Sequence, residues 1–128
     1  MSSMNRVYNI TNPYQGKAKK VLCVCSAGLL RSPTAANVLH KEFGYNTRAV
    51  GTSSEYALIP IEDVHILWAD EVVVMSGDQE EYVKSTGVKY KELINLNIPD
   101  QYGFMDIELQ DLISKRYNLW LLSQEAQL

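Results

Sequence analysis

The amino-acid sequence predicts an α/β fold in three layers (α/β/α), with a four-stranded parallel sheet between two layers of helices. Short runs of apolar, mostly β-branched residues alternate with longer amphipathic segments in the order βαβαβαβα, and no internal repeat or linker interrupts them. The run at 19–25 is apolar on both faces, as expected for a central parallel strand, and the run at 70–75 is short and strongly β-branched. Such alternation favours a parallel sheet with helices on both faces.

Length and composition predict a single folded domain. A chain of 128 residues with 46% hydrophobic and 21% charged residues is large enough to bury a core without disulfides or metals. We expect this domain to span residues 19–128. Residues 1–18 contain few periodic apolar positions, and Pro13 and Gly16 are turn signals, so we expect an irregular arm there.

Charge and cysteine content argue against several classes of partner. The formal net charge of −3 provides no basic excess for binding the phosphates of nucleic acid. The sequence has no apolar run of the roughly 18–20 residues that a membrane span requires, and its beginning lacks the apolar core of a secretory signal. Cys23 and Cys25 lie too close in the sequence for a framework of structural disulfides. We therefore expect a cytoplasmic protein without nucleic-acid or membrane partners, and the sequence predicts no particular oligomeric state.

The first strand and the first helix carry explicit boundary signals. Residues 19–25 form the strand, which ends at a loop of small residues. The helix is expected over 32–43, with Ser32 as its N-cap, Pro33 at its first position and Gly44 as its stop. Its apolar positions form one stripe, which consists of Ala35, Val38, Leu39 and Phe43.

The remaining elements follow at regular intervals. We expect strands at 45–50, 70–75 and 90–96, and helices from about residue 60, over 78–85 and over 106–122. The short helix near residue 60 has apolar residues at helical spacing, namely Ile61, Val64, Leu67 and Trp68. The last helix has a predicted buried stripe of Leu109, Leu112, Ile113, Tyr117 and Trp120. In a parallel sheet of this kind, ligands bind beyond the carboxyl ends of the strands, where Cys25 lies.

The loop after Cys25 contains the residues needed to hold an oxyanion beside a thiol. Cys25 is followed by five residues and then by Arg31 and Ser32. The thiolate is the reactive form of cysteine. Inward-pointing loop amides, the positive end of the following helix and the Arg31 guanidinium would all stabilise it. Arg31 also presents a planar fork that matches two phosphate oxygens.

The small residues of this loop fit the same purpose, because their backbone can fold closely around an anion. The predicted phosphate-binding set consists of Arg31 and the five residues before it, namely Ser26, Ala27, Gly28, Leu29 and Leu30. Gly28 can adopt a positive φ without strain. Ser32 has a second predicted role, because its hydroxyl can donate to the thiolate when Cys25 becomes a leaving group. The alternative is a buried cysteine at a strand end and an arginine on the surface.

These residues resemble the phosphate-binding loop of the low-molecular-weight protein tyrosine phosphatase family, Cys-x5-Arg-Ser followed by Pro. A nucleophile near the N-terminus is also characteristic of that family. The similarity extends to AVGT at 49–52 and to ADEVVVM at 69–75, and it covers roughly residues 19–122. The resemblance implies a phosphotyrosine-phosphatase I-like fold and a phosphocysteine intermediate. It also implies phosphorylated proteins or small phosphomonoesters as substrates, without a cofactor.

Asp100 is the predicted general acid, since expulsion of an alkoxide or phenoxide requires a proton donor. It follows the last strand in the segment INLNIPDQYGF, on a loop rich in turn residues. In the family the acid lies in an Asp-Pro-Tyr stretch of this region, whereas here Pro99 precedes the acid. Asp106 and Glu55 are the alternative acids, and an aspartate after a proline is also common in ordinary turns.

Two positions depart from the family's loop. Gly28 stands where the family usually has an asparagine that stiffens the loop, and Leu30 stands where a second cysteine is often found. The family's protective disulfide is therefore not expected with Cys25. Cys23 is predicted to be a packed core residue, because its position on the same strand suits a disulfide poorly.

Aromatic and histidine residues complete the candidates. Tyr102 could stack on an aromatic substrate, and Tyr56 could form a second aromatic wall or pack in the core or on the surface. His40 and His65 are isolated on predicted helices, without cysteines or acidic residues at ligand spacing. No metal site is therefore expected.

The leading hypothesis is a cysteine-dependent phosphomonoesterase that acts on protein phosphotyrosine. The residues do not distinguish this substrate from phosphorylated sugars, phosphoserine or phosphoarginine. An arsenate reductase of similar fold would need further cysteines, and none follows Cys25. A non-catalytic module that binds a phosphorylated ligand is the other alternative, because the loop and the acid segment both depart from the family pattern.

Overall fold

The computed structural model describes residues 18–26 and 30–126. In this part of the chain the elements are Lys20–Cys25 (β1), Arg31–Phe43 (α1), Asn46–Gly51 (β2), Asp63–Trp68 (α2), Glu71–Val74 (β3), Gly77–Ser85 (α3), Leu93–Asn95 (β4) and Ile107–Ala126 (α4). Strands and helices alternate as the sequence predicts. The predicted arm lies outside the described residues, except for Ala18.

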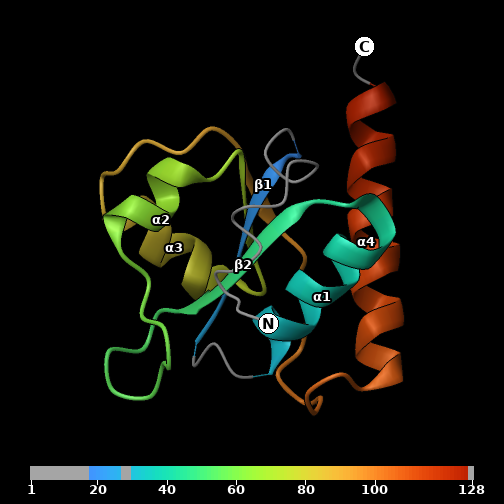
Figure 1. The fold of residues 1–128 in the computed structure, drawn as a ribbon, viewed down its shortest axis with the longest axis horizontal. Coiled ribbons are helices and arrows are strands. Elements are labelled where there is room, and N and C mark those ends of the chain that lie inside the picture. The colour runs from blue at the N-terminus through green and yellow to red at the C-terminus, as the bar shows by residue number, and fades with distance from the viewer. Residues whose placement is uncertain (1–17, 27–29, 127–128) are drawn as a thin grey trace.

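The described strands form one four-stranded sheet in the order β2-β1-β3-β4, and every pair is parallel. Along β1 and β2 the register runs from Lys20 opposite Asn46 to Cys25 opposite Gly51. Helices α1 and α4 cover one face of the sheet, whereas α2 and α3 cover the other (Figure 1). The predicted three-layer α/β fold is therefore confirmed, with β1 in the interior of the sheet.

Alternate residues of β1 point to opposite faces of the sheet. Val21, Cys23 and Cys25 belong to the core on the α1 and α4 side, whereas Leu22 and Val24 belong to the core on the α2 and α3 side. All five side chains are almost completely buried. This double burial explains why the β1 sequence is apolar without a break, and it confirms Cys23 as a core residue.

Helix α1 begins earlier than the sequence predicts. Its N-cap is Leu30, so the prediction of Ser32 as N-cap and Pro33 as first residue is wrong. The physical reason is that Ser32 faces the sheet, where it is fully buried and its hydroxyl bonds to groups of β1 and β2. The hydroxyl of Thr34 bonds instead to the Leu30 carbonyl. The predicted stop is confirmed, since Gly44 adopts a φ of 71° as the C-cap.

Helix α2 is shorter than predicted and buries less apolar surface. It starts after Glu62, which forms a capping box with His65. The predicted apolar set divides into a buried Ile61, a half-buried Trp68, and exposed Val64 and Leu67. Because α2 makes fewer than two turns, only one narrow side of it reaches the sheet.

The last strand and the last helix also differ in extent from the prediction. Strand β4 has three residues and not the seven of 90–96, and α4 continues to Ala126. The predicted stripe of α4 does face the core: Leu109, Ile113 and Tyr117 are buried, and Leu112 and Trp120 pack against them. Within the described ranges, none of the helices has the length and apolarity that crossing a bilayer would need.

A buried polar cluster lies at the amino ends of the strands. Glu71 at the start of β3 is 4% exposed, and its carboxylate accepts hydrogen bonds from Lys19 Nζ at 2.8 Å and from the Tyr117 hydroxyl at 2.7 Å. Lys19 also lies over the ring of Tyr45. A buried carboxylate is tolerated here because it has both a counter-charge and hydrogen-bond donors.

The carboxyl ends of the strands meet at the opposite edge of the sheet. There the N–H of Thr52 donates to the Cys25 carbonyl at 2.9 Å, and the N–H of Met75 donates to the Val24 carbonyl at 3.1 Å. The N–H of Ile98, which follows β4, donates to the Met75 carbonyl at 2.6 Å. These bonds bring the segments that follow the four strands side by side around Cys25, as expected for a ligand site in a parallel sheet.

Candidate active site

Cys25 ends β1 with its side chain against the start of α1. Its Sγ lies 3.2 Å from Ser32 Oγ, and the Ser32 hydroxyl donates to the Val50 carbonyl at 3.3 Å. A serine hydroxyl has one hydrogen and two acceptor lone pairs. As a thiol, Cys25 therefore donates to Ser32; as a thiolate, it can accept the Ser32 hydrogen in place of Val50. The arrangement places a hydrogen-bond donor where a departing thiolate would need one.

Arg31 is the first residue of α1, and its guanidinium is buried. Nη1 donates to the Ile98 carbonyl at 2.9 Å, and Nε lies 3.6 Å from Oδ1 of Asp100. Both partners belong to the segment after β4, so the arginine joins the helix start to the predicted acid. The alternative of a surface arginine is wrong, because the Arg31 side chain is only 5% exposed.

The three candidate acids occupy different environments. Asp100 is paired with Arg31, and its side chain is 72% exposed. Asp106 marks the start of α4, where its Oδ1 accepts a hydrogen bond from the N–H of Glu108 at 2.8 Å. Glu55 is exposed in the loop after β2. Of these acids, Asp100 is the one that lies at the strand ends beside Arg31.

Residues 96–105, which contain Asp100, form the acid segment, and two residues that the sequence analysis missed hold it in place. Arg116 of α4 donates from Nη1 to the carbonyls of Leu96, at 2.9 Å, and Asn97. Thr34 of α1 accepts a hydrogen bond from the N–H of Met105 at 2.9 Å. Asn97 and Met105 have φ values of 53° and 60°, so the segment turns sharply at both ends. Contacts between such distant elements leave no local pattern in the sequence.

Gln79, at the start of α3, is a third residue that the sequence analysis missed. Its side chain is fully buried. Oε1 accepts a hydrogen bond from the backbone N–H of Ser76 at 2.8 Å, and Nε2 donates to Ser26 Oγ at 3.0 Å. Ser76 and Gln79 have the spacing of a capping box, which is a recognisable helix-start signal. Only the fold shows that the amide also reaches the residue after Cys25.

Part of the predicted phosphate-binding set can be placed. The carbonyl of Ser26 accepts a hydrogen bond from the N–H of Ser53 at 2.8 Å, so the loop begins as a continuation of the sheet. Leu30 is 41% exposed at the other end of the loop. Ala27, Gly28 and Leu29 lie outside the described residues, and their contacts with an anion stay predictions.

The two predicted substrate-flanking tyrosines differ in their surroundings. Tyr56 is 71% exposed, and its N–H donates to Ser53 Oγ at 3.1 Å. Tyr102 packs against the core beneath α1 and α4 and lines a shallow hollow with Leu112 and Lys115 of α4. Their roles beside a substrate stay predictions.

Cys23, the other cysteine of β1, is a buried thiol. Burial raises the pKa of the Cys23 thiol, and the negative charges possible on Cys25 and Glu71 raise it further. Cys23 is therefore protonated and unreactive near neutral pH. Across residues 18–26 and 30–126, no group of three or more His, Cys, Asp and Glu side chains is arranged to hold a metal ion.

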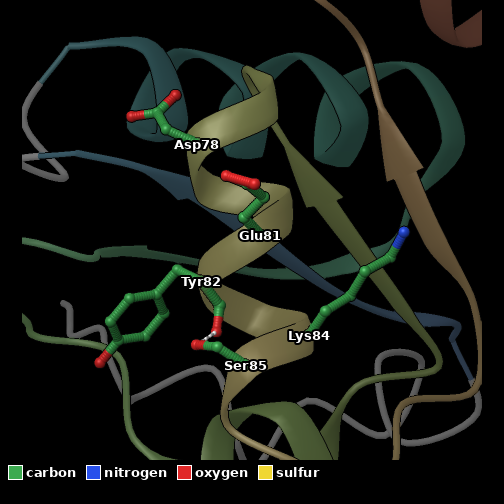
Figure 2. Close-up of a pocket in the computed structure, with 5 residues that line it drawn as sticks. All are labelled: Asp78, Glu81, Tyr82, Lys84 and Ser85. Atoms are coloured by element: carbon green, nitrogen blue, oxygen red, sulfur yellow. Dashed lines mark hydrogen bonds between the residues drawn. The ribbon is translucent and has the colours of Figure 1, made fainter.

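A separate hollow lies on the exposed side of α3. Figure 2 shows the side chains that line it, which are Asp78, Glu81, Tyr82, Lys84 and Ser85. The Ser85 hydroxyl donates to the Tyr82 carbonyl at 2.7 Å. All five residues come from one helix, whereas the buried Gln79 side chain points from that helix toward the strand ends. The hollow is therefore distinct from the site around Cys25.

Comparisons with known proteins identify the fold. No protein-family model and no curated protein sequence matches the chain. Among solved structures, YwlE arginine phosphatase from Geobacillus stearothermophilus is 20% identical with a TM-score of 0.56, and the match covers 85% of this chain and 96% of that chain. Vibrio vulnificus Wzb in complex with benzylphosphonate is 15% identical with a TM-score of 0.62, covering 80% and 96%. A YwlE mutant from Bacillus subtilis is 19% identical with a TM-score of 0.59, covering 80% and 99%. At these identities the similarity establishes the α/β fold alone.

Proposed function

We propose that this protein is a cysteine-dependent phosphomonoester hydrolase of the low-molecular-weight protein tyrosine phosphatase family, acting on protein phosphotyrosine in the cytoplasm. The observation that carries the proposal is the position of Ser32 Oγ 3.2 Å from Cys25 Sγ, with Arg31 and Asp100 paired at the same edge of the sheet. Similarity in fold to an arginine phosphatase and to Wzb with a bound phosphonate also supports it.

The first chemical step is phosphoryl transfer to sulfur. The Cys25 thiolate attacks phosphorus, an S–P bond forms, and the P–O bond to the leaving group breaks. Asp100 gives its proton to the leaving oxygen. Arg31 exchanges its contacts with the acid segment for two phosphoryl oxygens, and the loop amides of residues 26–31 donate to the same oxyanion.

The second step is hydrolysis of the phosphocysteine. Water attacks phosphorus while the Asp100 carboxylate takes up its proton, the S–P bond breaks, and inorganic phosphate leaves. The thiolate that departs accepts the hydroxyl hydrogen of Ser32. Arg31, the loop amides and the start of α1 supply the positive charge for both steps, so we propose that neither a metal nor a cofactor is required.

Phosphotyrosine is the proposed substrate because of the family resemblance and the two predicted substrate-flanking tyrosines, Tyr56 and Tyr102. Phosphoarginine is the second candidate, since one structure with the same fold is described as an arginine phosphatase. A panel of a phosphotyrosine peptide, a phosphoarginine peptide, a phosphoserine peptide and a sugar phosphate distinguishes them by kcat/KM. A preference for the phosphoarginine peptide would contradict the tyrosine assignment and leave the thiol mechanism in place.

The test of the activity is hydrolysis of p-nitrophenyl phosphate by the purified full chain, with and without a chelator. We expect chelator-resistant turnover and a loss of about 10⁴-fold or more in kcat for Cys25→Ser, as for removal of other catalytic nucleophiles. Cys23→Ala is the matched control, because Cys23 is a core residue on the same strand and should retain turnover. Residual turnover that Cys25→Ser does not change would refute the mechanism.

Rapid mixing separates an enzyme from a module that only binds. Accumulation of the phosphocysteine gives a burst of p-nitrophenol that matches the amount of protein. Binding of inorganic phosphate without any turnover of the panel would instead identify a binding module and overturn the proposed activity.

A further inference from the structure

We infer that Gln79 is a positioning residue: its amide donates to the Ser26 hydroxyl oxygen and thereby directs the Ser26 hydrogen to the negative charge at Cys25. That charge is on the thiolate before substrate binds and on the phosphoryl group afterwards. The inference rests on the proposed function and adds one side-chain donor, Ser26, to the backbone amides of the loop. Gln79 acts through Ser26 and does not itself touch the substrate.

The orientation of the Gln79 amide is determined by its partners. Its Oε1 lies 2.8 Å from the backbone nitrogen of Ser76, and a backbone N–H can only donate. The Ser76 hydroxyl also lies within hydrogen-bond distance of Oε1, at 2.9 Å. The atom that faces Ser26 is therefore the amide nitrogen, which can only donate.

This orientation decides what the Ser26 hydroxyl can do. Because Gln79 Nε2 donates to Ser26 Oγ at 3.0 Å, the hydroxyl must accept there, and its single hydrogen is left for another acceptor. The second amide hydrogen of Gln79 points to Asp78 Oδ2 at 3.3 Å. In the part of the chain that the structure describes, no side chain or carbonyl accepts the Ser26 hydrogen. An anion held after Cys25 would provide that acceptor.

The backbone around Ser26 is held from the other side by the segment after β2. The Ser26 carbonyl accepts from Ser53, and the Cys25 carbonyl accepts from Thr52, at 2.8 and 2.9 Å. With both its backbone and its oxygen held, Ser26 has only the rotation of its hydroxyl left to adjust. The fully buried Gln79 amide is compensated by its hydrogen bonds with Ser76, Ser26 and Asp78, because burying an unpaired amide would be costly.

The competing explanation is that Gln79 only caps α3, and Gln79→Glu separates the two roles. A glutamate still accepts from Ser76, as in the common Ser-x-x-Glu capping box, but it cannot donate to Ser26 and instead takes the Ser26 hydrogen. We expect kcat/KM for p-nitrophenyl phosphate to fall about 10- to 100-fold, the range for one hydrogen bond to a charged group. The pH at which iodoacetamide alkylation of Cys25 reaches half its maximal rate should move upward.

Substitutions of Ser26 test the same hydrogen-bond route without adding a charge. Ser26→Ala should lower kcat/KM to a similar degree, and Ser26→Thr, which keeps a hydroxyl, should retain most of the wild-type value. In the Ser26→Ala background, Gln79→Glu should have little further effect, because its route to the anion is already lost.

The control for the added negative charge is Ser85→Glu. It adds the same charge at the other end of α3, where Figure 2 shows Ser85 far along the helix from Asp78. This control should leave both kcat/KM and the alkylation profile unchanged.

The outcomes distinguish failure of this inference from failure of the proposed function. Additive losses in Ser26→Ala and Gln79→Glu, or a Gln79→Glu enzyme with unchanged turnover and alkylation, would overturn the inference and leave a helix cap. Absence of Cys25-dependent turnover in the wild-type protein would overturn the proposed function. The pH midpoint of Cys25 alkylation would then show by itself whether the contact between Gln79 and Ser26 influences the charge at Cys25. If Gln79→Glu fails to fold, as circular dichroism would reveal, the Ser26→Ala and Ser26→Thr pair decides.

Discussion

Removing one partner of the buried cluster at the amino ends of the strands should cost more stability when the lysine is lost than when the carboxylate is lost. Lys19→Met leaves the Glu71 carboxylate, with a 5% exposed side chain, without its counter-charge. Glu71→Gln leaves Lys19, which is 38% exposed and can reach water. The Tyr117 hydroxyl can still donate to either side chain at position 71.

The magnitudes follow from these exposures. Breaking a fully buried pair costs about 3–5 kcal/mol, and the water that reaches Lys19 screens the pair. We therefore expect Lys19→Met to lower the free energy of unfolding by about 2–3 kcal/mol. Glu71→Gln should cost about 1–1.5 kcal/mol, which is less than a fully buried charge-assisted hydrogen bond, because water solvates the released Lys19. The double variant should have nearly the same free energy of unfolding as Glu71→Gln alone, because Lys19 no longer has a carboxylate to pair with.

The assay is urea denaturation of the four proteins, which yields a double-mutant cycle. Lys91→Met is the matched control, since it breaks the exposed pair with Asp70 and should cost less than about 0.5 kcal/mol. Burial by itself lowers the pKa of Lys19, but its interactions with Glu71, and to a smaller extent with Tyr45, outweigh burial and raise the pKa above 10.5. The stability from this pair is thus full below pH 10.5 and is lost as the pH rises through the raised pKa. Equal costs for Lys19→Met and Glu71→Gln would refute the reasoning.

Three further predictions concern the acid segment and helix α2. Asp100→Asn should lower kcat about 10²- to 10⁴-fold for phenyl phosphate, whose leaving group needs a proton, and much less for p-nitrophenyl phosphate; equal losses would argue against a general acid. Arg116→Met should lower kcat for phenyl phosphate about tenfold, by loosening the start of the acid segment, without weakening phosphate binding; a matching loss of phosphate affinity would contradict this role. Burial lowers the pKa of His65 below 6.5, and the nearby charge of Glu62 offsets only part of this shift. Because the unfolded chain then takes up the His65 proton at a higher pH than the folded protein does, the stability that His65 contributes is full above pH 6.5 and declines as the pH falls below that value. His65→Gln keeps an acceptor for the Glu62 N–H but cannot titrate. Denaturation at a series of pH values should therefore show that the wild type loses stability relative to His65→Gln as the pH falls. The same dependence of stability on pH in both proteins would contradict this prediction.

Local patterns in the sequence were sufficient for the order of strands and helices, and they predicted where an anion site would lie. The unbroken apolar run of β1, ended by a turn of small residues, predicted a strand buried on both faces, and a small-residue loop followed by Arg31 indicated an anion site at its end. Gly44 marked the end of α1 for an equally local reason, because it adopts a left-handed conformation. The apolar spacing of α2 was misleading, since a six-residue helix has too little surface to bury Val64 and Leu67.

The sequence by itself determined the α/β fold, and it predicted Cys25 as the nucleophile, Arg31 beside it and Asp100 as the candidate acid. Only the tertiary structure decided how these groups are supported: Ser32 faces Cys25 in place of capping α1, Arg116 and Thr34 hold the acid segment, and Gln79 reaches Ser26. The physical reason is that strand and helix signals arise between near neighbours in the chain. A side-chain hydrogen bond between the ends of different strands depends on the order and register of the sheet, which no local pattern encodes.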